Sequence, residues 1–265
     1  MQVTVISGLF AVLFYLIAAT LQASKDSGSG NMRNQVFSLG AVAVAAHAVS
    51  AFGVLRIDDG YRFGIVEISS LITVLIAASV LFSCMRRPLA NLAIPLFPLA
   101  AFAIVISLMA RSDYPPINMS PGLASHVLIS IMAYSIFSVA ALQAAFVAYQ
   151  NYQLKHAHAG GILRHLPPLQ DMEAFLFELL WIGQLLLSLG IVAGLVFFDD
   201  IWDNEGIIHK AFFSLLAWVV FAILLWGRHQ RGWRGRTAVR GTLAGFVLLI
   251  IGFYGSKLVL EIILR

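Results

Sequence analysis

The sequence predicts an all-α fold, a polytopic transmembrane helical bundle that crosses the bilayer about eight times with both chain ends outside. Of its 265 residues, 60% are hydrophobic and only 11% are charged, whereas soluble chains carry about 25% charged residues. Apolar runs long enough to span a bilayer, about 20 residues each, recur along the whole chain. No stretch resembles a soluble domain, so we expect a single transmembrane domain over residues 1–265.

Eight apolar runs are the candidate spans, and short segments with Gly, Pro, Asp or basic residues separate them. The first run lacks the basic segment that precedes the apolar part of a signal peptide, so we expect it to remain as a span. In chain order the predicted spans are residues 3–23, 34–54, 66–84, 89–110, 122–149, 174–198, 210–227 and 241–263.

Basic residues favour the loops after the first, third, fifth and seventh predicted spans. Such loops face the cytoplasm in most membrane proteins, which predicts that both termini lie outside. The same distribution forms no basic surface stripe, so we expect a lipid bilayer and no nucleic acid as partner. The last of these loops could bind anionic lipid or haem propionates, although topology alone accounts for its charge. Its arginines are Arg228, Arg231, Arg234, Arg236 and Arg240.

Three histidines are predicted near the outer ends of spans. At 1.5 Å per residue, His47 lies about 12 Å below the outer end of its helix and His126 roughly 8 Å below the same surface. His209 lies where the seventh span leaves the outer loop. Two facing imidazoles suit six-coordinate haem iron, whereas zinc fits less well because no Cys, Asp or Glu stands at ligand spacing. The simpler alternative is that each histidine makes one hydrogen bond between helices.

Three segments together resemble the cytochrome c assembly (haem-handling) membrane proteins. Residues 125–135, SHVLISIMAYS, are similar to that family's pattern of a small residue, His, apolar residues, Ser and Tyr. Residues 190–194, GIVAG, resemble its helix before the tryptophan-rich outer loop. Residues 210–222 and 231–235 resemble the helix and basic turn after that loop. The resemblance covers about residues 65–263 and is greatest to the short YpjD- and HemX-like inner-membrane branch.

The resemblance implies haem handling at the outer face of a bacterial inner membrane. His126 falls at the position of the family's first outer-face haem-ligand histidine. The outer loop, residues 198–205, keeps one tryptophan, Trp202, where haem-exporting members have a tryptophan-rich platform. The last span has no histidine near residues 252–255, where those members place a second outer ligand. The resemblance therefore implies the family scaffold with one retained ligand.

From both lines of reasoning we expect a haem-binding or haem-handling inner-membrane protein linked to cytochrome c assembly, and not an enzyme. Haem b would sit in the outer half of the bundle, with His126 as one axial ligand, His47 as the favoured second ligand and His209 as the reserve. Trp202 would contact the cofactor. A further membrane or haem-pathway protein is a candidate partner.

Two alternatives require no bound haem. A regulatory scaffold would control the level of a haem-biosynthetic or transport protein, and would be found with a stoichiometric partner. A transport accessory protein would need carboxylates inside the membrane that face a cavity. The predicted spans contain few of them.

Overall fold

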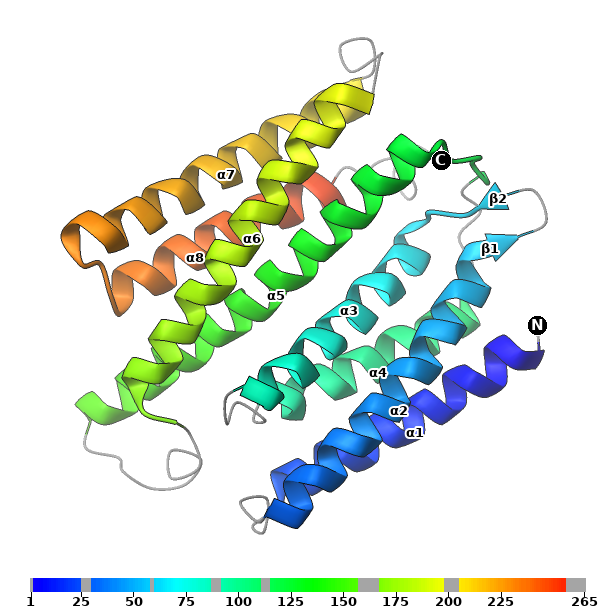
Figure 1. Ribbon diagram of the computed structural model, residues 1–265, viewed down its shortest axis with the longest axis horizontal. Helices are drawn as coiled ribbons and strands as arrows, with labels where there is room; N and C mark the ends of the chain where they lie inside the picture. The colour runs from blue at the N-terminus through cyan, green and yellow to red at the C-terminus, as the bar shows by residue number, and fades with distance from the viewer. Residues whose placement is uncertain are drawn as a thin grey trace. The chain divides into compact units, whose positions relative to one another are not determined.

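The computed structural model describes residues 2–24, 30–57, 60–86, 92–110, 115–156, 167–197 and 205–255. Over these residues the chain forms eight α-helices, a two-stranded hairpin and a short π-helix, η3, that continues the last α-helix (Figure 1). The strands are β1 (Arg56–Ile57) and β2 (Gly60–Tyr61), and η3 is Ile251–Gly255. The α-helices are α1 (Gln2–Ala23), α2 (Gly30–Leu55), α3 (Ile65–Arg86), α4 (Ala93–Met109), α5 (Pro121–Lys155), α6 (Leu169–Phe197), α7 (Glu205–Arg231) and α8 (Arg236–Ile250).

The prediction of an all-α polytopic bundle is confirmed. Each predicted span corresponds to one α-helix, and seven helices in the described part of the chain are long and apolar enough to cross a membrane. The exception is α4, whose 17 residues extend about 26 Å. In contrast, α5 has 35 residues and extends about 52 Å, beyond the roughly 30 Å of hydrocarbon. The orientation of the termini stays a prediction.

The chain divides into two compact units, residues 1–118 and 119–265. The prediction of a single transmembrane domain stays a prediction. In the first unit, α1 packs against α2 and α4, and α3 also packs against both, so the four helices form a closed ring. The hairpin follows α2, and Tyr61 exchanges two backbone hydrogen bonds with Ile117 (3.1 and 2.9 Å). Gly60, at φ 133°, supplies the left-handed conformation where the hairpin reverses.

The second unit is also a closed ring, in which α5 and α7 each pack against both α6 and α8. At its centre each helix contributes one residue to a layer. The rings of Phe137 (α5) and Phe221 (α7) stack at 4.0 Å between centroids with 7° between their planes. Gly183 (α6) faces Phe137, and Gly245 (α8) faces Phe221. We call these four residues the Phe–Gly layer.

Polar side chains connect the helices of the second unit. The Trp218 indole N–H donates to Ser188 Oγ (2.8 Å), and the Gln184 amide donates to the Trp218 carbonyl (3.3 Å), which joins α6 and α7. The Gln143 amide donates to the Met172 carbonyl (3.0 Å), which joins α5 and α6. Because hydrocarbon offers polar groups no water, such bonds fix the register of neighbouring helices.

Candidate functional site

His126 lies near the start of α5 and contacts α6. The hydroxyl of Ser120 accepts a hydrogen bond from the Leu123 N–H (3.3 Å), so the helix begins at Pro121 with a side-chain cap. His126 follows five residues later, about 8 Å along the helix axis. Its Nδ1 lies 2.9 Å from the carbonyl oxygen of Gly190. A carbonyl can only accept, so Nδ1 carries the proton and the lone pair of the neutral ring is on Nε2.

Glycines on α6 make room for the imidazole. A Cβ added at Gly194 would lie 3.1 Å from His126 Cε1 and 3.3 Å from Nδ1. One turn earlier, a Cβ at Gly190 would lie 3.3 Å from Ser130 Oγ. The glycine spacing, a familiar feature of close helix packing, therefore also seats His126. A Cβ at position 194 would require the ring to shift by a few tenths of an ångström, and a branched side chain there would displace it further from the Gly190 carbonyl.

This arrangement suits metal ligation by a single imidazole. When one ring nitrogen donates to a backbone carbonyl, the tautomer is fixed and the other nitrogen presents its lone pair to a metal. The His126 side chain is only half-buried, so a large ligand could approach it. Among the described residues no group of three His, Cys, Asp or Glu side chains comes together. The residues at this site therefore fit haem, which brings its own four nitrogen ligands, better than a bare metal ion.

His47 has a different environment, in the core of the first unit. Its side chain is fully buried. Nδ1 is hydrogen-bonded to the Tyr15 hydroxyl (3.3 Å), and Nε2 is hydrogen-bonded to the Ser70 hydroxyl (3.1 Å). The three residues come from α1, α2 and α3. With both nitrogens engaged, this arrangement favours a structural role, and ligation of iron by His47 would first require one bond to break.

Replacement of His47 by alanine is expected to destabilise the first unit by about 2 kcal/mol, from two hydrogen bonds of roughly 0.6 kcal/mol each in a membrane and the cavity left behind. A lower midpoint of thermal unfolding in mild detergent would report it. The Tyr15→Phe variant removes one of the two bonds and should lose less. Wild-type stability in His47→Ala would contradict the structural role.

The other predicted site residues lie apart from these contacts. His209 is an exposed side chain in the second turn of α7. Because α5 and α7 both begin at the same end of the second unit, His209 lies at the end that holds His126. Trp202 lies outside the described residues. His47 belongs to the first unit and His126 to the second, so the predicted pairing of these two histidines stays a prediction.

A second feature of this unit was not identified in the sequence as a site. Tyr134 packs against the rings of Phe246, Phe253 and Tyr254, with centroids 6.1, 5.5 and 5.9 Å away. Two of these rings belong to η3, and π-helical turns often accompany functional sites. Tyr134 is only 9% exposed, and its hydroxyl has no hydrogen-bond partner among the residues that the structure describes. The sequence signal for this cluster is the pair of adjacent aromatic residues between two glycines at residues 252–255.

Comparisons with known proteins place the chain in a family. The sequence profile of the cytochrome c assembly protein family matches residues 35–264. The match starts before residue 65, where the resemblance was expected to begin, and therefore includes His47 as well as His126. No solved structure is significantly similar to the chain.

Similar curated proteins carry related names. The inner membrane protein YpjD of Escherichia coli (strain K12) is 29% identical over 241 residues, which cover 89% of this chain and 90% of that protein. The cytochrome c biogenesis protein CcsA of Prochlorococcus marinus (strain MIT 9303) is 24% identical over 68% of this chain and 64% of that protein. Protein HemX of Brevibacillus brevis is 25% identical over 50% of this chain and 49% of that protein.

The family match includes most of α2, all of the helices from α3 to α8, and every histidine that lies within a span, whereas α1 lies outside it. Seven helices in the described part of the chain are long and apolar enough to cross a membrane. The family match and these helices together identify the class of protein. The chain is a polytopic membrane protein and belongs to the cytochrome c assembly protein family.

Proposed function

We propose that this protein binds haem through His126, in the outer half of its second unit, and handles it for cytochrome c assembly. The observation that carries the proposal is the 2.9 Å hydrogen bond between His126 Nδ1 and the Gly190 carbonyl. That bond places the proton on Nδ1 and the lone pair on Nε2, the nitrogen through which the ring would bind a metal. Membership in a family named for cytochrome c assembly supports haem as the ligand.

The chain's own residues would hold the group without a covalent bond. Haem, when bound, would supply the iron, and the chain would fix its orientation. The Gly190 carbonyl holds the imidazole, and Gly194 leaves the space that the ring occupies. The sequence contains one cysteine, Cys84, so it has no pair of thiols for thioether attachment. A b-type haem is therefore the form we propose, with binding and transfer rather than catalysis as its role.

For the second axial position, His209 is better supported than His47. Both ring nitrogens of His47 are hydrogen-bonded within the first unit, whereas His209 is exposed and lies at the His126 end of the second unit. Trp202 precedes α7 in the sequence, and we keep it as a proposed cofactor-contacting residue. Once haem binding is measured, substitution of His209, His47 and Trp202 would test these roles.

The protein is a multi-pass protein of the inner membrane, the location stated in the name of the E. coli relatives. A relative named for cytochrome c biogenesis suggests that the haem is passed to that process. A partner of the haem pathway is therefore part of the proposal.

The first test is the absorption spectrum of protein purified in mild detergent from haem-replete cells. We expect a Soret band and, after dithionite reduction, sharp α and Soret bands at near-stoichiometric occupancy. A spectrum without haem bands from intact protein would contradict the proposal. A stoichiometric partner purified with that haem-free protein would favour the regulatory scaffold instead.

A further inference from the structure

The turn between α7 and α8 forms the most basic surface of the described chain. Residues 206–255 contain six basic residues and no acidic residue, and five of the six are arginines in or beside this turn. The facing end of α6 carries three acids, Asp171, Glu173 and Glu178, so five positive charges against three leave a net charge of +2 there. Lys155, at the end of α5, adds one more. Four of the arginines have exposed side chains: Arg231, Arg234, Arg236 and Arg240.

This turn is held by specific contacts. The backbone N–H of Trp233 donates to the Gly227 carbonyl (3.2 Å). The Trp233 indole lies so close to Gly227 that a Cβ at position 227 would collide with it. The Gly235 N–H donates to the buried Glu173 carboxylate (2.9 Å). Gly232 and Gly235 have φ values of 63° and 56°, which other residues adopt at a cost. The exposed arginines therefore project from a fixed backbone.

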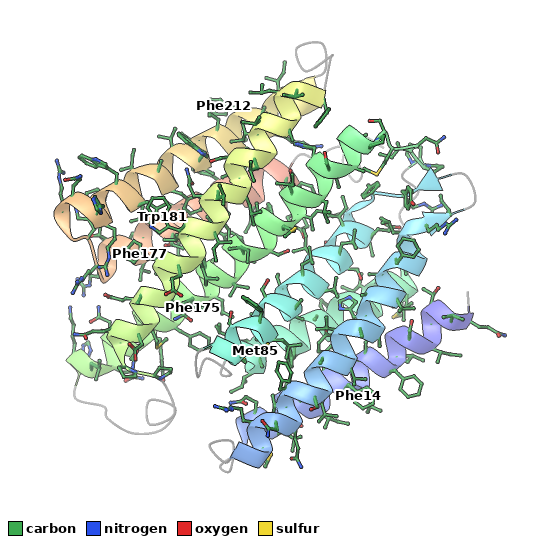
Figure 2. All side chains as sticks on the ribbon, in the orientation of Figure 1. Phe14, Met85, Phe175, Phe177, Trp181 and Phe212 are labelled. Carbon is green, nitrogen blue, oxygen red and sulfur yellow. The ribbon has the colours of Figure 1, made fainter. Side chains whose placement is uncertain are left out.

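Arg228 differs from the other arginines because its side chain makes contacts inside the turn. Its guanidinium donates to the Trp233 carbonyl (3.2 Å) and lies 4.6 Å from the centre of the Phe177 ring. Figure 2 shows Phe177 on α6, the helix next to this turn. The contacts of this half-buried arginine with an aromatic ring of α6 and with a carbonyl of the turn help to hold the turn against α6. The four exposed arginines are therefore the groups that we expect to bind an anionic ligand.

The residues around the four exposed arginines are typical of a membrane interface. Trp226 is 53% exposed on α7, and the Arg231 guanidinium lies 5.3 Å from the centre of its ring. Ile223 and Val247, on α7 and α8, are exposed apolar residues further from the turn. Tryptophan marks the headgroup level of a bilayer, and exposed apolar residues beyond it face acyl chains. We therefore expect the arginines at the depth of lipid phosphates.

The geometry points to a binding site for an anionic phospholipid headgroup at this turn, with Arg231 and Arg234 as its main phosphate ligands. Guanidinium groups bind phosphate oxygens through two parallel hydrogen bonds, which lysine does not reproduce. The fixed turn presents these groups without the entropic cost of ordering a loop. The site is independent of haem binding at the opposite end of the unit.

The test is native mass spectrometry of the purified protein in mild detergent, with dioleoyl phosphatidylglycerol and dioleoyl phosphatidylcholine at equal concentration. The wild-type protein should retain phosphatidylglycerol preferentially. The double variant Arg231→Gln/Arg234→Gln should lose preference by roughly 25-fold, about fivefold for each surface arginine. Arg231→Lys/Arg234→Lys keeps the charge but loses the two-bond geometry, and should show an intermediate preference.

The matched control removes the same charge elsewhere. Arg33 and Arg56 are exposed arginines of the first unit, and Arg33→Gln/Arg56→Gln should keep the wild-type preference. An equal loss in this control, or no loss in the double variant at the turn, would overturn the site. Displacement of the lipid by an excess of inorganic phosphate or of hemin would also overturn it, in favour of a general anion or haem-carboxylate site.

Discussion

Replacing His126 by alanine is expected to abolish the haem spectrum of the purified protein, while the variant still inserts and yields intact protein. The imidazole is the ligand that we propose, and alanine offers the iron no donor. The helix should tolerate the change, because alanine favours helices and the ring is only half-buried. Absorption spectra of equal amounts of wild-type and variant protein, with haem extracted and counted, measure the loss.

Two further variants separate ligation from simple helix contact. His156→Ala is the matched control, because the Nδ1 of His156 also lies within hydrogen-bond distance of a backbone carbonyl, that of Tyr152 (2.8 Å), at the other end of α5. It should keep the haem. Gly194→Val leaves the histidine in the chain but places atoms where its ring lies, and should lose haem as well. A normal spectrum in His126→Ala would reduce His126 to a hydrogen bond between helices.

The positions of the helices could be predicted from the sequence because hydrocarbon selects them by length and composition. The first predicted span, residues 3–23, differs by one residue from α1 (Gln2–Ala23). Helix ends in water were harder to place, since polar residues continue a helix beyond the bilayer without penalty. For this reason α5 continues to Lys155, six residues past its predicted end at 149.

The contacts of each histidine could not be predicted, because they depend on how far one helix is shifted along another. Periodicity places His47 on one face of α2, but not opposite Tyr15 or Ser70. In the same way the spacing of Gly190 and Gly194 indicates close helix packing, but not that His126 fills the space. A shift of one turn, about 5.4 Å, would have joined different residues.

The register itself comes from complementary large and small residues, and the Phe–Gly layer is the clearest case. Phe137 and Phe221 stack across the diagonal of the α5–α8 ring, and each ring needs a glycine on the adjacent helix. Composition alone cannot identify such pairs among 19 phenylalanines and 21 glycines. Because the layer fixes α5 against α6, it also sets the level at which Gly190 and Gly194 meet His126.

Loss of either stacked ring is expected to have the largest effect on stability. In soluble cores, Phe→Ala changes cost about 3–5 kcal/mol, and packing is the main force between helices in lipid. We expect Phe137→Ala and Phe221→Ala to lie in that range. A Cβ at Gly183 would already lie 2.8 Å from the Phe137 ring, so Gly183→Leu should cost about 1–3 kcal/mol through overpacking. Unfolding by SDS in mixed micelles measures each value.

The double variant Gly183→Leu/Phe137→Ala distinguishes this contact from a general effect of mutation. Leucine would enter the space that the ring leaves, so the double variant should be more stable than the sum of the single changes by about 1 kcal/mol or more. Phe212→Ala is the control, because Phe212 is 60% exposed on the outside of α7 (Figure 2) and should change stability by no more than about 0.5 kcal/mol. Additive single effects would mean that Gly183 and Phe137 do not share one packing site. The register that positions His126 would then need another origin, such as the hydrogen bond from Gln143 to the Met172 carbonyl.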